Sequence, residues 1–168
     1  MKSGDTNPPI FNLGPALDFL RQLWQVNHSL EQLSSRMEKR LGITGQQRLM
    51  LRCIGQHPGI TAGQLALLLH VDPGTVSASL RRLEERNLLQ RKRDPKDNRR
   101  VSLGLTAQGI TLDNPMEGNA EHAVQELLRG TDTAKIQTAI EVLQRLAELL
   151  NLESKDLSPF GGDTLPPA

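Results

Sequence analysis

Aromatic residues are nearly absent from this chain of 168 residues, which contains three Phe, one Trp and no Tyr. Its core must therefore be built from aliphatic side chains, and such a composition suits helices packed on helices. Hydrophobic residues make up 37% of the chain and charged residues 23%. That balance allows a buried core and does not favour global disorder.

Cysteine is also scarce, because Cys53 is the only one. A single cysteine excludes an intrachain disulfide framework and a thiolate metal cluster. Its aliphatic neighbours in the sequence favour a buried, inert thiol over a redox switch. The dipeptide Glu121-His122 has no second histidine one helical turn later, so we expect no metal site. No nucleophile elbow, phosphate loop or HExxH motif occurs, so we predict neither an enzyme nor a cofactor.

Long apolar runs are missing as well. No stretch approaches the ~18 uninterrupted apolar residues that a membrane span needs. The first nine residues are polar and lack the apolar centre of a signal peptide. We therefore expect a cytoplasmic protein with no membrane partner.

The net charge is only +1, but the charges are unevenly distributed. Residues 81–100 contain nine basic side chains and four acidic ones, so the remainder of the chain is acidic. A concentrated basic segment in a nearly neutral protein indicates a binding site for a polyanion rather than a general aid to solubility.

Helical periodicity begins after a predicted flexible arm at residues 1–12. Over residues 13–41 apolar side chains recur every three or four positions, and Gly42 ends the pattern as a helix-capping glycine would. The predicted helix has two apolar edges. We therefore expect it to contact two different surfaces.

Start signals then mark three short helices. Thr44 and Thr61 each precede a glutamine by three positions, which is the spacing of a capping box, and Asp72-Pro73 supplies an N-cap and a first-turn proline. The third helix is expected to end near Asn87. Residues 88–93 and 100–105 alternate in polarity around a turn at 94–98, which predicts a β-hairpin with a charged tip.

Two further helical stretches follow Thr106. The first is interrupted by Pro115 and Gly118 and runs to Leu128, and the second begins at residues 131–132 with one apolar face. From residue 154 onward the composition predicts a disordered tail.

Three helices followed by a hairpin is the order of a winged helix-turn-helix. The sequence therefore predicts a mainly α fold with a small β-hairpin wing. In detail, we expect an N-terminal dimerisation helix at 13–41, a winged helix-turn-helix DNA-binding lobe at 42–106, C-terminal dimerisation helices at 107–153 and the tail at 154–168.

The third short helix has the composition of a DNA-reading helix. Thr75, Ser77 and Ser79 are expected to point outward between the core residues Val76 and Leu80. Small polar side chains let a helix approach base edges in the major groove, and arginines one turn later would reach phosphates. Alternatively, these serines and threonines belong to an ordinary solvated helix face.

The charged tip of the predicted hairpin also indicates DNA binding. An arginine on a thin turn can enter a minor groove, and Asp97 could hold Arg99 in place by charge-assisted hydrogen bonds. The alternative is that a charged turn keeps the edge of a hairpin soluble.

The segment from Leu41 to Thr106 closely resembles the multiple-antibiotic-resistance regulator (MarR) family. The matching pieces are LGITGQQRLMLRCIGQHPGITAGQLA and VDPGTVSASLRRLEERNLLQRKRDPKDNRRVSLGLTAQG, with the family's D-x-R wing tip as Asp97-Asn98-Arg99. The resemblance implies a triangular homodimer in which terminal helices of two chains interleave and two winged modules reach successive major grooves of a pseudo-palindrome. The chain departs from the family pattern at His70 and Asn87, where glycine is common, and at Pro73-Gly74, where longer polar residues are common.

The predicted DNA-binding residues combine the recognition helix, the preceding helix and the hairpin: Gln64, Pro73, Gly74, Thr75, Ser77, Ala78, Ser79, Arg81, Arg82, Arg91, Arg93, Lys96, Asp97, Arg99 and Arg100. Family members often bind a small acidic or phenolic ligand between the dimer helices and the DNA-binding lobe. Trp24, His28, Arg48 and Arg52 are candidates for lining such a crevice, or are ordinary surface and core-edge residues.

The functional prediction is a dimeric, sequence-specific regulator of transcription, a repressor of a nearby operon, with double-stranded DNA and a possible small-molecule effector as partners. Two alternatives remain open at this point. One is a winged helix used for protein–protein contact, and the other is an architectural protein that binds DNA without sequence preference.

Overall fold

The computed structural model describes residues 13–93, 101–114 and 118–156, the last five of these by their backbone alone. The chain divides after Ala120 into two compact units. The predicted arm at 1–12 lies outside the described residues, and so does the tail beyond residue 156.

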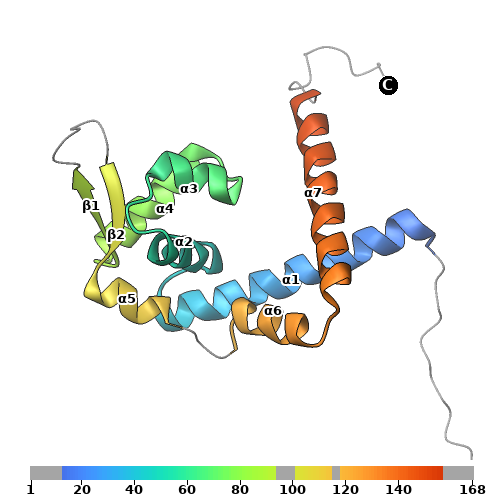
Figure 1. Cartoon of the computed structure of the whole chain (residues 1–168), viewed down its shortest axis with the longest axis horizontal. Coiled ribbons are helices and arrows are strands. Elements are labelled where there is room, and N and C mark those ends of the chain that lie inside the picture. Colours follow the sequence, from blue (N-terminus) through green and yellow to red (C-terminus); the bar gives the residue numbers. More distant parts are fainter. Residues whose placement is uncertain (1–12, 94–100, 115–117, 157–168) are drawn as a thin grey trace, which may run out of the picture. The chain divides into compact units, whose positions relative to one another are not determined.

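The first unit contains five helices and a hairpin among its described residues (Figure 1). Its elements are α1 (Pro15–Leu41), α2 (Gly45–Gln56), α3 (Ala62–Leu69), α4 (Pro73–Glu85), β1 (Leu89–Arg93), β2 (Val101–Leu105) and α5 (Ala107–Asp113). The second unit is built from α6 (Ala120–Arg129), whose first residue lies at the boundary, and α7 (Thr133–Asp156). The predicted mainly α architecture with a small β-hairpin wing is confirmed.

The start signals in the sequence act as expected. The Thr44 hydroxyl accepts a hydrogen bond from the Gln47 amide at 3.2 Å, and the Gln47 side chain accepts one from the Thr44 amide at 3.0 Å. Thr61 and Gln64 form the same capping box at the start of α3. These reciprocal bonds satisfy amides that a helix N-terminus would otherwise leave unpaired.

The hairpin pairs β1 and β2 in antiparallel register, from Leu89 opposite Leu105 to Arg93 opposite Val101. A third short segment joins it, because Thr61 bridges Ser102 and the Leu103 amide donates to the Ile60 carbonyl at 2.9 Å. Sequence periodicity does not predict this addition, since two residues are too few to show a strand pattern. It attaches the start of α3 to the hairpin stem.

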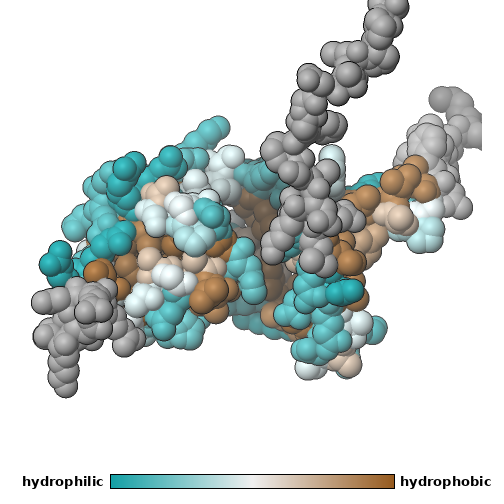
Figure 2. Space-filling model, turned by 90° about the horizontal axis from the view of Figure 1, so that it is seen from above, coloured by the Kyte–Doolittle hydropathy of each residue, from teal (hydrophilic) through white to brown (hydrophobic). Residues whose placement is uncertain are grey.

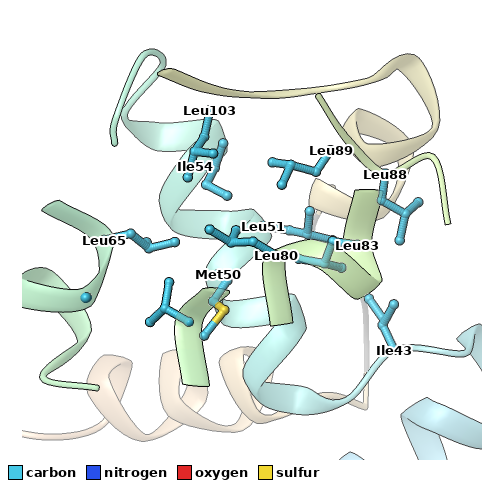
Figure 3. Close-up of a cluster of buried hydrophobic side chains, with 12 residues drawn as sticks. Ile43, Met50, Leu51, Ile54, Leu65, Leu80, Leu83, Leu88, Leu89 and Leu103 are labelled. Carbon is cyan, nitrogen blue, oxygen red and sulfur yellow. The ribbon is translucent and has the colours of Figure 1, made fainter. Parts of the chain in front are cut away.

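An aliphatic core joins α2, α3, α4 and the hairpin (Figure 3). Its members that are at most 3% exposed are Ile43, Met50, Leu51, Ile54, Leu65, Val76, Leu80, Leu83, Leu88, Leu89 and Leu103. Cys53, which we expected to be a buried, inert thiol, packs against this core and is partly buried. It lies at the edge of the apolar stripe of α2 rather than in its centre.

Two boundaries differ from the sequence prediction. Helix α1 begins at Pro15, where proline fits the first helical turn after Gly14, and not at residue 13. The stretch after Thr106 splits into α5 and α6, as the predicted interruption requires. Helix α7 continues to Asp156, past the point where we placed the start of the tail, because no glycine or proline interrupts residues 152–156.

The long helices leave many apolar side chains at the surface. None of the described residues of α1 is buried, and Trp24 is 76% exposed. Figure 2 shows hydrophobic residues in brown at the surface near the N-terminal end of α1. Helix α7 has an exposed apolar set of its own, formed by Ile140, Val142, Leu143, Leu149 and Leu150. No described helix is long and apolar enough to cross a membrane.

Candidate nucleic-acid interface

The N-terminus of α4 is closed by Asp72. Its Oδ1 atom accepts hydrogen bonds from the Gly74 amide at 2.8 Å and the Thr75 amide at 3.1 Å. Pro73 occupies the first helical turn, where its missing N–H costs nothing. A side chain at Gly74 would place its Cβ 2.9 Å from Asp72 Oδ1, so glycine keeps this cap compact.

Helix α4 has two opposite faces. Val76, Leu80 and Leu83 are completely buried and hold the helix against the core. Pro73, Gly74, Thr75, Ser77, Ala78, Arg81 and Arg82 are exposed, and Ser79 is half-buried. Small polar side chains are therefore exposed in the first turns of α4, and two exposed arginines follow one turn later. No described element of the chain buries this face.

The turn between α3 and α4 depends on His70. This residue adopts the left-handed conformation, with φ 50° and ψ 43°, and its amide donates to the carbonyls of Ala66 and Leu67. Asn87 adopts the same kind of conformation after α4, with φ 54°. Both residues were identified from the sequence as substitutes for glycine, and both belong to types that tolerate positive φ.

The stem of the hairpin carries exposed basic side chains. Arg91 Nε lies 2.8 Å from Glu84 Oε2, which ties β1 to the end of α4. Arg93 is exposed and lies on the same face of β1 as Arg91, since side chains alternate along a strand. In α4, Arg81 makes a 3.5 Å ion pair with Glu85. The stretch 81–93 thus combines six basic and two acidic side chains, and both acids have a basic partner.

Lys96, Asp97, Arg99 and Arg100, which we predicted to contact DNA, lie outside the described residues. Gln64 is exposed on α3, but its side-chain oxygen is engaged by the amide and hydroxyl of Thr61. Its amide nitrogen remains the atom by which it could approach a ligand.

Two hollows lie among the described residues, and neither is lined by the four candidate ligand residues. A hollow of about 140 Å³ in the first unit is lined by Arg36 and Arg40 over Leu33, Met37 and Leu41. A more open one of about 590 Å³ lies between the ends of α2 and α3. None of the four lines either hollow: Trp24 and His28 are exposed on α1, and His28 contacts Gln32 at 2.8 Å.

Arg48 and Arg52 were candidates either for a ligand crevice or for ordinary surface and core-edge positions. Arg48 is only 2% exposed, and its guanidinium donates to the carbonyls of Leu112 and Asn114. Arg52 makes a 2.8 Å ion pair with Asp113. Both are therefore engaged by the end of α5. The sequence held one signal for this, namely an arginine at a position of α2 that shares a face with core residues.

Among the described residues, no group of three or more His, Cys, Asp or Glu side chains is close enough together to hold a metal ion.

Comparisons with known proteins agree with this geometry. The model of the MarR family matches residues 43–101. The chain is similar to the uncharacterized HTH-type transcriptional regulator YybA of Bacillus subtilis, with 26% identity over 77% of this chain and 86% of YybA. It is also similar to the HTH-type transcriptional repressor MdtR of Bacillus subtilis, with 29% identity over 71% of this chain and 76% of MdtR.

A solved structure extends the similarity to three dimensions. The chain superposes on MepR of S. aureus, crystallised as a MepR–DNA complex, with a TM-score of 0.64 and 25% identity over 79% of this chain and 97% of MepR. The family model, the similar sequences and the solved structure indicate the same family. The family match places residues 43–101 of the chain in the MarR family of transcriptional regulators.

Proposed function

We propose that this chain is a homodimeric, sequence-specific DNA-binding repressor that acts in the cytoplasm on a pseudo-palindromic operator. It acts by binding and not as an enzyme. In this proposal residues 42–106 form the DNA-binding lobe, and residues 13–41 and 107–153 form the dimer.

The outward face of α4 is the observation that carries the proposal. Thr75 and Ser77 stand on a helix whose opposite side is locked into the core by Val76 and Leu80. A major groove about 12 Å wide admits one helix, and short hydroxyl side chains allow its backbone to come close to base edges. A helix enclosed by its own chain would not need an exposed face of small hydroxyl side chains.

Basic side chains flank this helix where phosphates would pass. Arg81 is 76% exposed, so its weak pairing with Glu85 can be exchanged for a phosphate at little cost. The Arg91–Glu84 pair, whose side chains are 38% and 32% exposed, links the hairpin stem to α4. Arg93 continues this basic edge toward the predicted wing tip.

Two chains would supply the two halves of the operator. Helices α1 and α7 both leave several large apolar side chains exposed, and a contiguous exposed apolar surface marks an interaction site. A two-fold dimer buries such faces and places its recognition helices about 34 Å apart, one turn of DNA. The relatives support this reading, since MepR was crystallised with DNA and MdtR is named a repressor.

A small-molecule effector would release DNA by favouring a different dimer geometry. Of the four candidate ligand residues, Trp24 and His28 remain in the proposal because both are exposed on α1. Arg48 and Arg52 leave it, because the end of α5 engages both guanidinium groups.

Selection of bound duplexes from a random DNA library, followed by fluorescence anisotropy on the selected duplex, tests the proposal. We expect a two-fold symmetric consensus and an affinity that falls steeply with salt. Ser77→Glu should weaken binding at least about tenfold, because a carboxylate would face base edges and phosphates. Ser35→Glu, at an exposed serine of α1, is the matched control and should change little. Binding without sequence preference would indicate an architectural protein, and no binding would indicate a protein–protein module.

The predicted wing tip needs its own test. Arg99→Ala should weaken binding to the selected duplex and lower the salt dependence by about one phosphate contact, while the dimer stays folded. Unchanged affinity would contradict the role of the wing, whereas the proposal for α4 would stand.

A further inference from the structure

Three residues of α2 contact the end of α5. Arg48, Arg52 and Gly55 follow one another at spacings of four and three, so they lie on one face of the helix. Arg48 donates to the Leu112 carbonyl and, at 2.9 Å, to the Asn114 carbonyl. Arg52 donates to the Asp113 backbone carbonyl and, at 2.8 Å, to its carboxylate.

Gly55 completes this contact by leaving room. A Cβ at this position would lie 2.4 Å from Asp113 Oδ2, which is closer than real contacts allow. The carboxylate of Asp113 therefore occupies the space that a side chain would fill. We call Arg48, Arg52, Gly55 and Asp113 the α5 clamp.

The clamp binds a helix end that needs donors. The last carbonyls of a helix have no partner within the helix and carry the negative end of its dipole, so two guanidinium groups suit them well. The other end of α5 is held too: the Thr106 hydroxyl donates to the Asn87 carbonyl at 2.6 Å, and a Cβ at Gly109 would lie 2.0 Å from the Leu88 carbonyl oxygen. Helix α5 is thus fixed to the DNA-binding lobe at both ends.

Stability alone does not explain why one buried and one half-buried arginine hold this contact. Apolar side chains of similar volume often replace a buried ionic group without loss of stability. The planar guanidinium fork differs from an apolar contact in that it donates hydrogen bonds to its acceptors in a narrow range of geometries. The α5 clamp therefore holds the end of α5 in one orientation relative to α2.

We infer that the α5 clamp sets the direction in which the chain leaves the DNA-binding lobe, and so determines which spacing of operator half-sites the dimer accepts. The inference rests on the proposed function. Asn114 is the last described residue before the connection to α6, and the clamp holds the carbonyls on both sides of Asp113. Arg48, Arg52 and Asp113 act as positioning residues, since they need not touch DNA.

The test uses duplexes in which the two selected half-sites are moved apart or together by one or two base pairs. Each added base pair shifts a half-site by about 3.4 Å and turns it around the helix axis, so the wild-type dimer should lose about tenfold in affinity per step. In Asp113→Ala and Arg52→Met we expect this difference to fall below about threefold, because the lobes can then adopt several directions. Asp113→Asn keeps a carbonyl oxygen as acceptor and should restore the wild-type profile.

These variants avoid Arg48, whose burial makes loss of folding a concern, whereas the Arg52 and Asp113 side chains are each 22% exposed. Thermal melting and sedimentation confirm folding and dimerisation of each variant. A folded Asp113→Ala dimer with the wild-type spacing profile, or with affinity lowered equally at every spacing, would overturn the inference. So would a wild-type protein without any preferred spacing. If the wild type selects no duplex at all, the proposed function fails instead.

Discussion

The winged lobe and the long helices solve the problem of burying apolar surface in opposite ways. In the lobe, short helices with strong caps enclose an aliphatic core whose central residues have no exposure at all. In α1 none of the described residues is buried. In α6 and α7 the side chains of Val124, Leu127, Leu143 and Leu150 are between 48% and 64% exposed. The comparison teaches that the lobe is complete within one chain, whereas the helices carry surface suited to a second copy.

The prediction with the largest expected effect concerns the exposed apolar surface of the long helices. Leu20→Glu combined with Leu143→Glu places two charges in the proposed dimer interface, where the desolvation of each ion costs several kcal/mol. We expect the dimer to dissociate into monomers, as measured by sedimentation equilibrium. Gln22→Glu with Gln144→Glu adds the same charges at exposed polar positions and should leave the dimer intact. Dimers that survive the leucine substitutions would place the interface elsewhere.

The next effect concerns the lobe itself. Leu80→Ala removes a side chain with 0% exposure and should lower the free energy of unfolding by about 2–5 kcal/mol. Urea denaturation followed by circular dichroism measures the change. Leu67→Ala, at a leucine that is 77% exposed, should change it by no more than about 0.5 kcal/mol. Equal losses in both variants would mean that the lobe has no closed core of its own.

A smaller effect separates local hydrogen bonding from packing in the lobe. Asp72→Ala removes the acceptor for the Gly74 and Thr75 amides, so we expect a loss of about 1 kcal/mol. Asp72→Asn keeps an acceptor and should recover most of that loss. Both values come from the same denaturation series. A loss as large as that of Leu80→Ala would show that the cap, and not the core, holds α4 in place.

The smallest effect concerns the left-handed turn at His70. His70→Gly relieves the unfavourable left-handed conformation but increases the entropy of the unfolded chain, so we expect a net stabilisation of at most about 1 kcal/mol. His57→Gly is a matched control, because His57 caps α2 with φ −125° and gains nothing from glycine. Differential scanning calorimetry compares the two melting temperatures. A larger stabilisation at His57 than at His70 would contradict this account of the turn.

The sequence predicted local features well because their causes are local. The capping boxes at Thr44 and Thr61, the cap at Asp72 and the positive φ of His70 each depend on residues a few positions apart. The same holds for the hairpin stem, whose alternation is visible in the sequence. The outward face of α4 followed from its periodicity.

Features that join distant segments were not predictable in this way. Arg48 contacts residues more than 60 positions away, and from the sequence it was equally compatible with a ligand crevice. The bridge between Thr61 and Ser102 joins segments that show no shared pattern. The end of α7 was misplaced by a few residues, because helix ends fray without a breaker to mark them.

The bridge between Thr61 and Ser102 has a mechanical consequence for the evolution of specificity. Because the hairpin stem is paired with the start of α3 as well as with its own partner strand, contacts outside the hairpin help to hold its base. Substitutions in residues 94–100 would leave these contacts of the base in place. If those residues contact DNA as proposed, a lineage could change its sequence preference there while the base stays constant.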